Sequence, residues 1–150
     1  MSQRRVARRT ALQLLYQAEI WGGPTLPQVD VSQVLSQWER EFAPRADAVE
    51  YVRGVVEGVS STVVRLDALI ADYAIGWAVE RMAVVDKNIL RLALFEMVYR
   101  SDIPWQVAVN EAVELAKRYA TPDTASFVNG ICAAVQRDIE SGELSPPGKD

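Results

Sequence analysis

The residues that this 150-residue chain lacks narrow its function more than those it contains. There is no histidine in the sequence. Histidine is the commonest general base and the commonest protein ligand of zinc, so its absence removes every Ser-His and Cys-His arrangement for nucleophilic catalysis. No GxGxxG, Walker, CxxC or HExxH motif is present either. The sequence therefore favours a binding protein over an enzyme, with no catalytic residue and no cofactor.

Cysteine and long apolar runs are also scarce. Cys132 is the single cysteine, so the chain can form no intramolecular disulfide and no thiolate cluster for a metal. Its apolar neighbours predict a buried, inert thiol. No run approaches the roughly 18 apolar residues that span a bilayer, and no apolar segment of a secretory signal follows the first arginines. We expect a cytoplasmic protein with no metal site and no membrane contact.

The remaining composition is that of a folded domain. Hydrophobic residues make up 49% of the chain and charged residues 24%, and 150 residues suit one domain. Apolar residues recur at helical spacing, and no segment alternates as a strand does. We predict an all-α fold, a compact bundle of seven to eight helices over residues 1–140 with a join near Gly76. Glycine and proline in residues 141–150 predict a disordered tail.

The helices are predicted from their apolar stripes and their breaks. The stripes lie at residues 7–18, 31–42, 49–59, 63–73, 86–100, 105–119 and 123–139. Ser60 and Ser61 are predicted to cap the fourth helix. Residues 86–100 are apolar nearly all round, which is typical of a helix in the middle of a bundle. Asn129 and Gly130 weaken a helix interior, so we expect close helix packing at the glycine and a buried hydrogen bond from the asparagine.

Positive charge is concentrated at the start of the chain. Arg4, Arg5, Arg8 and Arg9 contribute +4 with no acidic residue among the first nine, and the whole chain carries −4, so the rest sums to −8. A helix N-terminus also disfavours nearby positive charge. This asymmetry predicts a local basic site on an acidic body.

A helical projection separates these arginines from the core stripe. At about 100° per residue, Arg5, Arg9 and Tyr16 fall opposite the apolar stripe, and Arg8 falls on its flank. The three arginines and the tyrosine are therefore predicted to share an outward surface. Arginine binds phosphate through two parallel hydrogen bonds, and an exposed tyrosine can stack on an unpaired base. From the residues alone, an RNA contact and an ordinary solvated face are equally good interpretations.

Several segments of the chain resemble one known family. Residues 4–17, RRVARRTALQLLYQ, resemble the opening of the bacterial transcription antitermination factor family NusB. Residues 85–96, 101–104, 109–117 and 127–130 resemble later segments of that family, in the same order. The resemblance implies an all-helical fold of two packed three-to-four-helix bundles, without catalysis.

The resemblance also implies partners. NusB-like proteins bind the boxA element of ribosomal RNA leader transcripts. They do so with the small-subunit ribosomal protein also called NusE, in a complex that lets RNA polymerase pass terminators. The resemblance therefore implies binding of boxA-type single-stranded RNA, NusE and the RNA polymerase antitermination complex.

Family positions suggest the contact residues. Arg5 and Arg8 match the arginine motif that contacts RNA, and Tyr16 matches the aromatic residue after it. Asp123 and Phe127 match positions near the RNA path. The expected RNA-binding set is Arg4, Arg5, Arg8, Arg9, Tyr16, Asp123 and Phe127, and the expected NusE-binding residue is Asp86.

The chain departs from the family pattern at two places, and alternatives remain open. Arg9 stands where the family usually has an acidic residue, which should strengthen phosphate attraction. Residues 120–125 differ from the commoner glycine-containing loop. One alternative is an RNA-binding module that acts with a separate rRNA methyltransferase. Another is an interaction scaffold or homodimer that buries its arginine face against itself.

Overall fold

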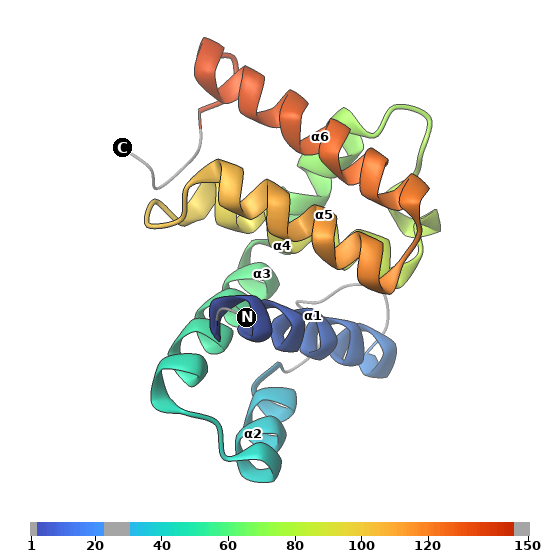
Figure 1. Cartoon of the computed structure of the whole chain (residues 1–150). Coiled ribbons are helices and arrows are strands. Elements are labelled where there is room, and N and C mark those ends of the chain that lie inside the picture. Colours follow the sequence, from blue (N-terminus) through green and yellow to red (C-terminus); the bar gives the residue numbers. More distant parts are fainter. Residues whose placement is uncertain (1–2, 23–30, 146–150) are drawn as a thin grey trace. The chain divides into compact units, whose positions relative to one another are not determined.

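A computed structural model describes residues 3–22 and 31–145 and is helical throughout most of these ranges (Figure 1). It contains six α-helices, one short 3₁₀ helix and no strand within the described part, so the predicted all-α class is confirmed. The elements are α1 (Gln3–Gly22), α2 (Val31–Phe42), α3 (Ala46–Tyr73), η2 (Val79–Arg81), α4 (Val84–Tyr99), α5 (Trp105–Tyr119) and α6 (Pro122–Ser141). The chain divides into two compact units, Met1–Val63 and Val64–Asp150.

The helix count is lower than predicted because Ser60 and Ser61 do not begin a new helix. They lie inside α3, a continuous helix of 28 residues. The hydroxyl groups of Ser61 and Thr62 donate to the carbonyl oxygen of Gly58, at 3.1 and 2.7 Å, which satisfies them within the helix. The apolar stripe continues past them without a change of spacing, so nothing ends the helix there.

The extent of the domain and of its tail stay predictions. The division between the two units falls within α3. Gly76, the predicted join, forms the turn after α3 with a left-handed φ of 84°. Of the tail predicted for residues 141–150, residues 146–150 lie outside the described residues.

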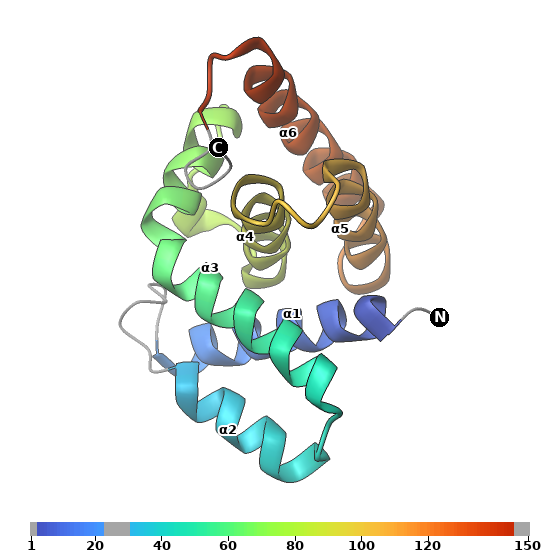
Figure 2. The same cartoon turned by 90° about the vertical axis from the view of Figure 1, so that its left-hand side faces the viewer.

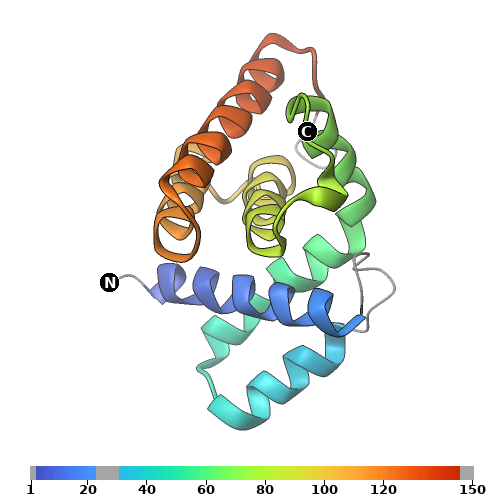
Figure 3. The same ribbon diagram turned by 90° about the vertical axis from the view of Figure 1, so that its right-hand side faces the viewer.

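The first unit contains α1, α2 and the first part of α3. α1 packs on α2 (Figure 3). Arg53 links α3 to α2, since its Nε donates to Glu39 Oε2 at 2.8 Å, and it also pairs with Glu57 at 2.9 Å within α3. α2 ends at Phe42, and the next residue, Ala43, adopts a left-handed φ of 40° just before Pro44.

The second unit is built around α4. This helix lies between the last part of α3 and α5, and α5 also packs on α6 (Figure 2). Every residue from Lys87 to Val98 is buried, which confirms the predicted central helix. Cys132 on α6 is fully buried, and burial raises the pKa of its thiol to about 12. In the described ranges, no helix is both long and apolar enough to span a bilayer.

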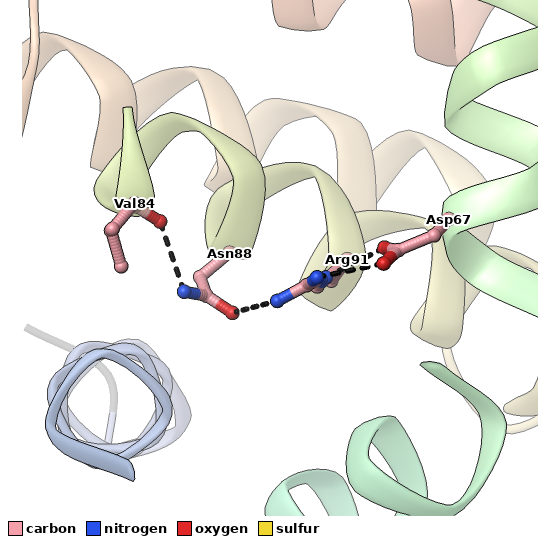
Figure 4. A network of polar contacts seen from close by, with 4 residues as sticks. All are labelled: Asp67, Val84, Asn88 and Arg91. Atoms are coloured by element: carbon pink, nitrogen blue, oxygen red, sulfur yellow. Dashed lines mark hydrogen bonds and ion pairs between the residues drawn. The ribbon is translucent and has the colours of Figure 1, made fainter. Parts of the chain in front are cut away.

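A charged side chain lies inside this second unit. Arg91 on α4 is 1% exposed, and its Nε and terminal nitrogen donate to the two carboxylate oxygens of Asp67 on α3, at 2.7 and 2.8 Å (Figure 4). Its other terminal nitrogen donates to Asn88 Oδ1 at 3.2 Å, and the Asn88 amide donates to the Val84 carbonyl at 2.9 Å. This network compensates a buried guanidinium and fixes α4 against α3.

The packing predicted for Asn129 and Gly130 is wrong. Both residues are exposed, and a Cβ added at Gly130 would meet no atom within 4 Å. The residues of α6 that are buried include Val128, Cys132 and Val135, which share one face at helical spacing. Asn129 and Gly130 point away from that face by about 100° or more.

Substitution of Asp67 tests the buried ion pair. We expect Asp67→Asn to lower the free energy of unfolding by about 2–3 kcal/mol, because Arg91 would keep a buried charge without its counter-ion. Asp72→Asn on the exposed side of the same helix should change it by less than about 0.5 kcal/mol. Urea unfolding of both variants measures the difference, and equal stabilities would contradict the role assigned to the pair.

Substitution of Gly130 tests the corrected position of that residue. We expect Gly130→Ala to raise the free energy of unfolding by about 0.5–1 kcal/mol, because alanine favours a helix interior and open space surrounds the site. Thermal unfolding followed by circular dichroism gives the shift. A fall in stability would mean that the glycine is packed after all.

Candidate nucleic-acid interface

The basic site starts at the beginning of α1. Arg4 and Arg5 are exposed, and the first turn of the helix contains no acidic residue. Positive charge at a helix N-terminus is disfavoured by the helix dipole. An incoming anion would relieve this repulsion, so the exposed arginines form a surface suited to phosphate.

Tyr51 on α3 gathers two of the arginines. The guanidinium carbon of Arg4 lies 4.9 Å from the centre of the Tyr51 ring, and that of Arg8 lies 5.7 Å from it. Both distances are within the range of a cation–π interaction. Tyr51 itself is only 6% exposed, so the ring is a fixed platform. Helical spacing alone did not identify Tyr51 as part of the site. The only indication in the sequence was that this aromatic residue stands next to Val52 of the apolar stripe.

The orientation predicted for Arg8 is wrong. Its side chain is 3% exposed, although the projection placed it on an outward surface with the other arginines. The buried sector of α1 is wider than predicted, since Leu12 and Glu19 are also buried. At 100° per residue both project within about 40° of Arg8. Arg8 therefore belongs to the packed face of α1.

Tyr16 and Arg5 keep the predicted outward orientation. Tyr16 is 45% exposed and Arg5 is exposed, whereas Arg9 is half-buried. An exposed aromatic ring on the same helix as exposed guanidinium groups is a surface on which an unpaired base can stack. Arg4, Arg5 and Tyr16 are thus the accessible members of the predicted set in the first unit.

The other predicted residues surround one pocket in the second unit. This pocket has a volume of about 280 Å³, and Asp86, Asp123 and Phe127 line it. Asp86 lies in the first turn of α4, and Asp123 lies in the first turn of α6. Family positions assigned Asp86 to a protein partner and the other two to RNA, but the structure places all three at the same pocket.

Hydrogen bonds at the start of α6 fix the geometry of this pocket. Thr121 caps the helix by accepting from the backbone nitrogen of Thr124 at 3.1 Å, and Pro122 occupies the first turn. The Thr124 hydroxyl lies 3.2 Å from Asp86 Oδ2 and donates to it. The capped end of α6 is therefore held against the first turn of α4.

Trp77, which directly follows the predicted join at Gly76, completes the pocket. Its ring lies 6.2 Å from that of Phe127 with a 60° tilt, and the residue is 61% exposed. Tilted aromatic pairs at this separation are favourable. The indication that the sequence offered for a role of Trp77 was its place in a short connection between helices.

The predicted residues thus form two groups, one in each unit. That both groups contact the same RNA stays a prediction. Among the residues that the structure describes, no group of three or more acidic, histidine or cysteine side chains is arranged to hold a metal ion. What the two groups offer is cationic and aromatic surface in the first unit, and aromatic and acidic surface in the second.

This all-helical architecture, with a basic helix start and an exposed aromatic residue, defines a class of small helical binding proteins. A match to the NusB family covers residues 5–137, and the chain belongs to this family. It is 46% identical over 141 residues to the transcription antitermination protein NusB of Symbiobacterium thermophilum, with 91% of each chain covered.

Solved structures of the same family share the fold. T. maritima NusB is 33% identical to the chain with a TM-score of 0.81, covering 95% of this chain and 99% of that one. A chain from the crystal structure of antitermination factors NusB and NusE in complex with dsRNA is 24% identical with a TM-score of 0.77, covering 89% and 96%. At that identity the second likeness supports the fold alone.

The burial of Arg8 leads to a stability prediction. We expect Arg8→Ala to lower the free energy of unfolding by about 1–3 kcal/mol, because it removes a packed aliphatic stem and a cation–π interaction. Arg5→Ala should change it by less than about 0.5 kcal/mol. Urea titration followed by circular dichroism compares them, and two equally stable variants would contradict the packed position of Arg8.

Proposed function

We propose that this chain is a transcription antitermination factor that binds boxA-type single-stranded RNA together with ribosomal protein NusE. The observation that carries the proposal is membership of the NusB family over residues 5–137. Relatives such as the NusB of Symbiobacterium thermophilum match it along nearly their whole length. In this role it acts within the RNA polymerase antitermination complex in the cytoplasm, as a binding protein without catalysis or cofactor.

In this proposal the basic start of α1 contacts the RNA backbone. Arg4 and Arg5 are exposed and offer their guanidinium groups to phosphates. The chain as a whole carries −4, so attraction of RNA is confined to this region. Tyr16 on the outward face of α1 supplies a ring on which one base can stack.

Arg8 has a different role from its neighbours. It is packed and lies over the Tyr51 ring, together with Arg4. We assign it to holding the basic cluster in place, with Arg4 and Arg5 making the outer contacts. Arg9 adds positive charge where the family usually has an acid, which increases sequence-independent attraction to phosphate.

NusE is the protein partner in this proposal. Support comes from membership of the NusB family over residues 5–137, because the resemblance to NusB-like proteins implies NusE as a partner. Asp86 in the first turn of α4 is the residue assigned to this contact. Since Asp86 lies on α4 and the arginines lie on α1, NusE adds affinity in this proposal without competing for the arginines.

Charge reversal at the two exposed arginines tests the RNA contact. We expect Arg4→Glu/Arg5→Glu to weaken binding of a boxA-type oligonucleotide by at least about tenfold. The slope of log affinity against log salt should become shallower by about 0.7 for each phosphate that is no longer neutralised. Fluorescence anisotropy at several salt concentrations measures both quantities, while circular dichroism checks that the variant stays helical.

The matched control changes the net charge equally at another place. Arg65→Glu/Arg137→Glu alters two arginines on α3 and α6, away from the start of α1 in the sequence. It should bind RNA with nearly unchanged salt dependence and only a small decrease in affinity. Normal RNA binding by the Arg4/Arg5 variant, or an equal decrease in the control, would refute the proposed site.

A further inference from the structure

The first unit contains a hollow between α1 and α2 that has no part in the contacts described so far. Its volume is about 410 Å³, and it is lined by α1 over residues 10–17 and by α2 over residues 34–42. Pockets that hold small organic molecules have volumes of about 300–1,000 Å³. The α1–α2 hollow is therefore large enough for a group of the size of a nucleobase.

The lining of the α1–α2 hollow combines carboxamide groups with aromatic rings. Gln13, Gln17 and Gln37 supply three carboxamides, each of which can both donate and accept hydrogen bonds. Trp38 and Phe42 supply the rings, and Phe42 is 70% exposed. Proteins bind an unpaired base by stacking an aromatic ring on its face and by hydrogen bonding to its edge. The hollow offers both kinds of contact.

Charge in the hollow favours a base over a phosphate. Glu41 is the only charged residue in its lining, so a phosphate would meet an anion and no cation there. The Gln37 amide donates to Glu41 Oε1 at 3.0 Å, which orients the carboxylate, and Oε2 has no hydrogen-bond partner among the described residues. Because a carboxylate can only accept, it favours a base with an exocyclic amino group, such as cytosine, over uracil.

The hollow adjoins the outward face of α1, on which the RNA is proposed to lie. Gln13, which lines the hollow, is exposed and follows Arg9 by about one helical turn. At 100° per residue it projects about 40° from Arg9 and about 60° from Tyr16. Arg5 precedes Gln13 by eight residues, which is about 12 Å along the helix axis. A few nucleotides of a single strand span this distance, so one strand can reach both places.

We propose that the α1–α2 hollow binds one amino-bearing base of the single-stranded RNA. The base stacks on the exposed ring of Phe42, and the carboxamides bond to its edge. Glu41 accepts from its exocyclic amino group, while the phosphates stay outside the hollow. The inference rests on the proposed function, since it takes RNA as the ligand, and it adds a subsite that selects a base. The residues of the pocket in the second unit take no part in it.

Removal of single bases from the RNA tests the hollow. The probes are a boxA-type oligonucleotide and a set in which one nucleotide at a time is abasic, so that every phosphate is kept. The readout is the indole N–H resonance of Trp38 in the whole chain, identified by its disappearance in Trp38→Phe. We expect the parent RNA to shift this resonance. At one position the abasic RNA should abolish the shift and bind at least about fivefold more weakly, because a stacked base is lost.

A variant of the carboxylate separates base recognition from overall charge. Glu41→Gln removes one negative charge, which by electrostatics alone would strengthen RNA binding. We expect it instead to weaken binding about fivefold, because a charge-assisted hydrogen bond to the base is lost. Glu50→Gln is the matched control, since Glu50 is an exposed acid on α3 of the same unit, and it should bind RNA at least as tightly as the unchanged chain. Uracil at the identified position should weaken binding to the unchanged chain but not to Glu41→Gln.

Three outcomes would overturn the proposal. They are RNA binding without a shift of the Trp38 resonance, equal or tighter binding by Glu41→Gln than by Glu50→Gln, and a shift of that resonance by NusE alone, which would assign the hollow to a protein. Failure of the proposed RNA site is visible separately, as normal RNA binding by Arg4→Glu/Arg5→Glu. If the RNA then still shifts the Trp38 resonance and one abasic position abolishes the shift, the base subsite stands without the arginine site.

Discussion

A guanidinium without solvent around it requires a fixed counter-charge, and in this chain that requirement sets the arrangement of the second unit. Arg91 lies on a helix whose residues are buried from Lys87 to Val98. It reaches Asp67 through two hydrogen bonds, so α4 can occupy one register against α3. With α4 in place, α5 and α6 pack on it, and the starts of α4 and α6 form the pocket that contains Asp86 and Asp123.

The first unit uses positive charge in a related way. Arg8 is buried over the Tyr51 ring, and Arg4 approaches the same ring from the start of α1. The buried arginine thus anchors a cluster whose outer members stay accessible. Buried cations fix the structure in both units, and the RNA contact is proposed for the exposed cations of α1. The function proposed for this NusB family member depends on that separation.

Much of the fold could be predicted from helical spacing, but the spacing does not reveal which polar residues are buried. The central position of α4 followed from its apolar surface, whereas the single long α3 was missed because serines in a helix interior look like caps. Arg8 was placed outward because two neighbours on its face, Leu12 and Glu19, were not counted as core. The low helix propensity of Asn129 and Gly130 predicted that close packing keeps them in the helix. The structure has open space at the glycine instead. The roles of Tyr51 and Trp77 depend on contacts between distant segments, which spacing cannot supply.

The central claim is selective binding of RNA with a protein partner. The most direct measurement is a titration of the whole chain with boxA-type RNA and with a scrambled RNA of equal length, each with and without NusE, at several salt concentrations. We predict tighter binding of the boxA-type RNA, a further gain with NusE, and affinities that fall as salt rises. Equal affinity for both RNAs with no gain from NusE would contradict the claim.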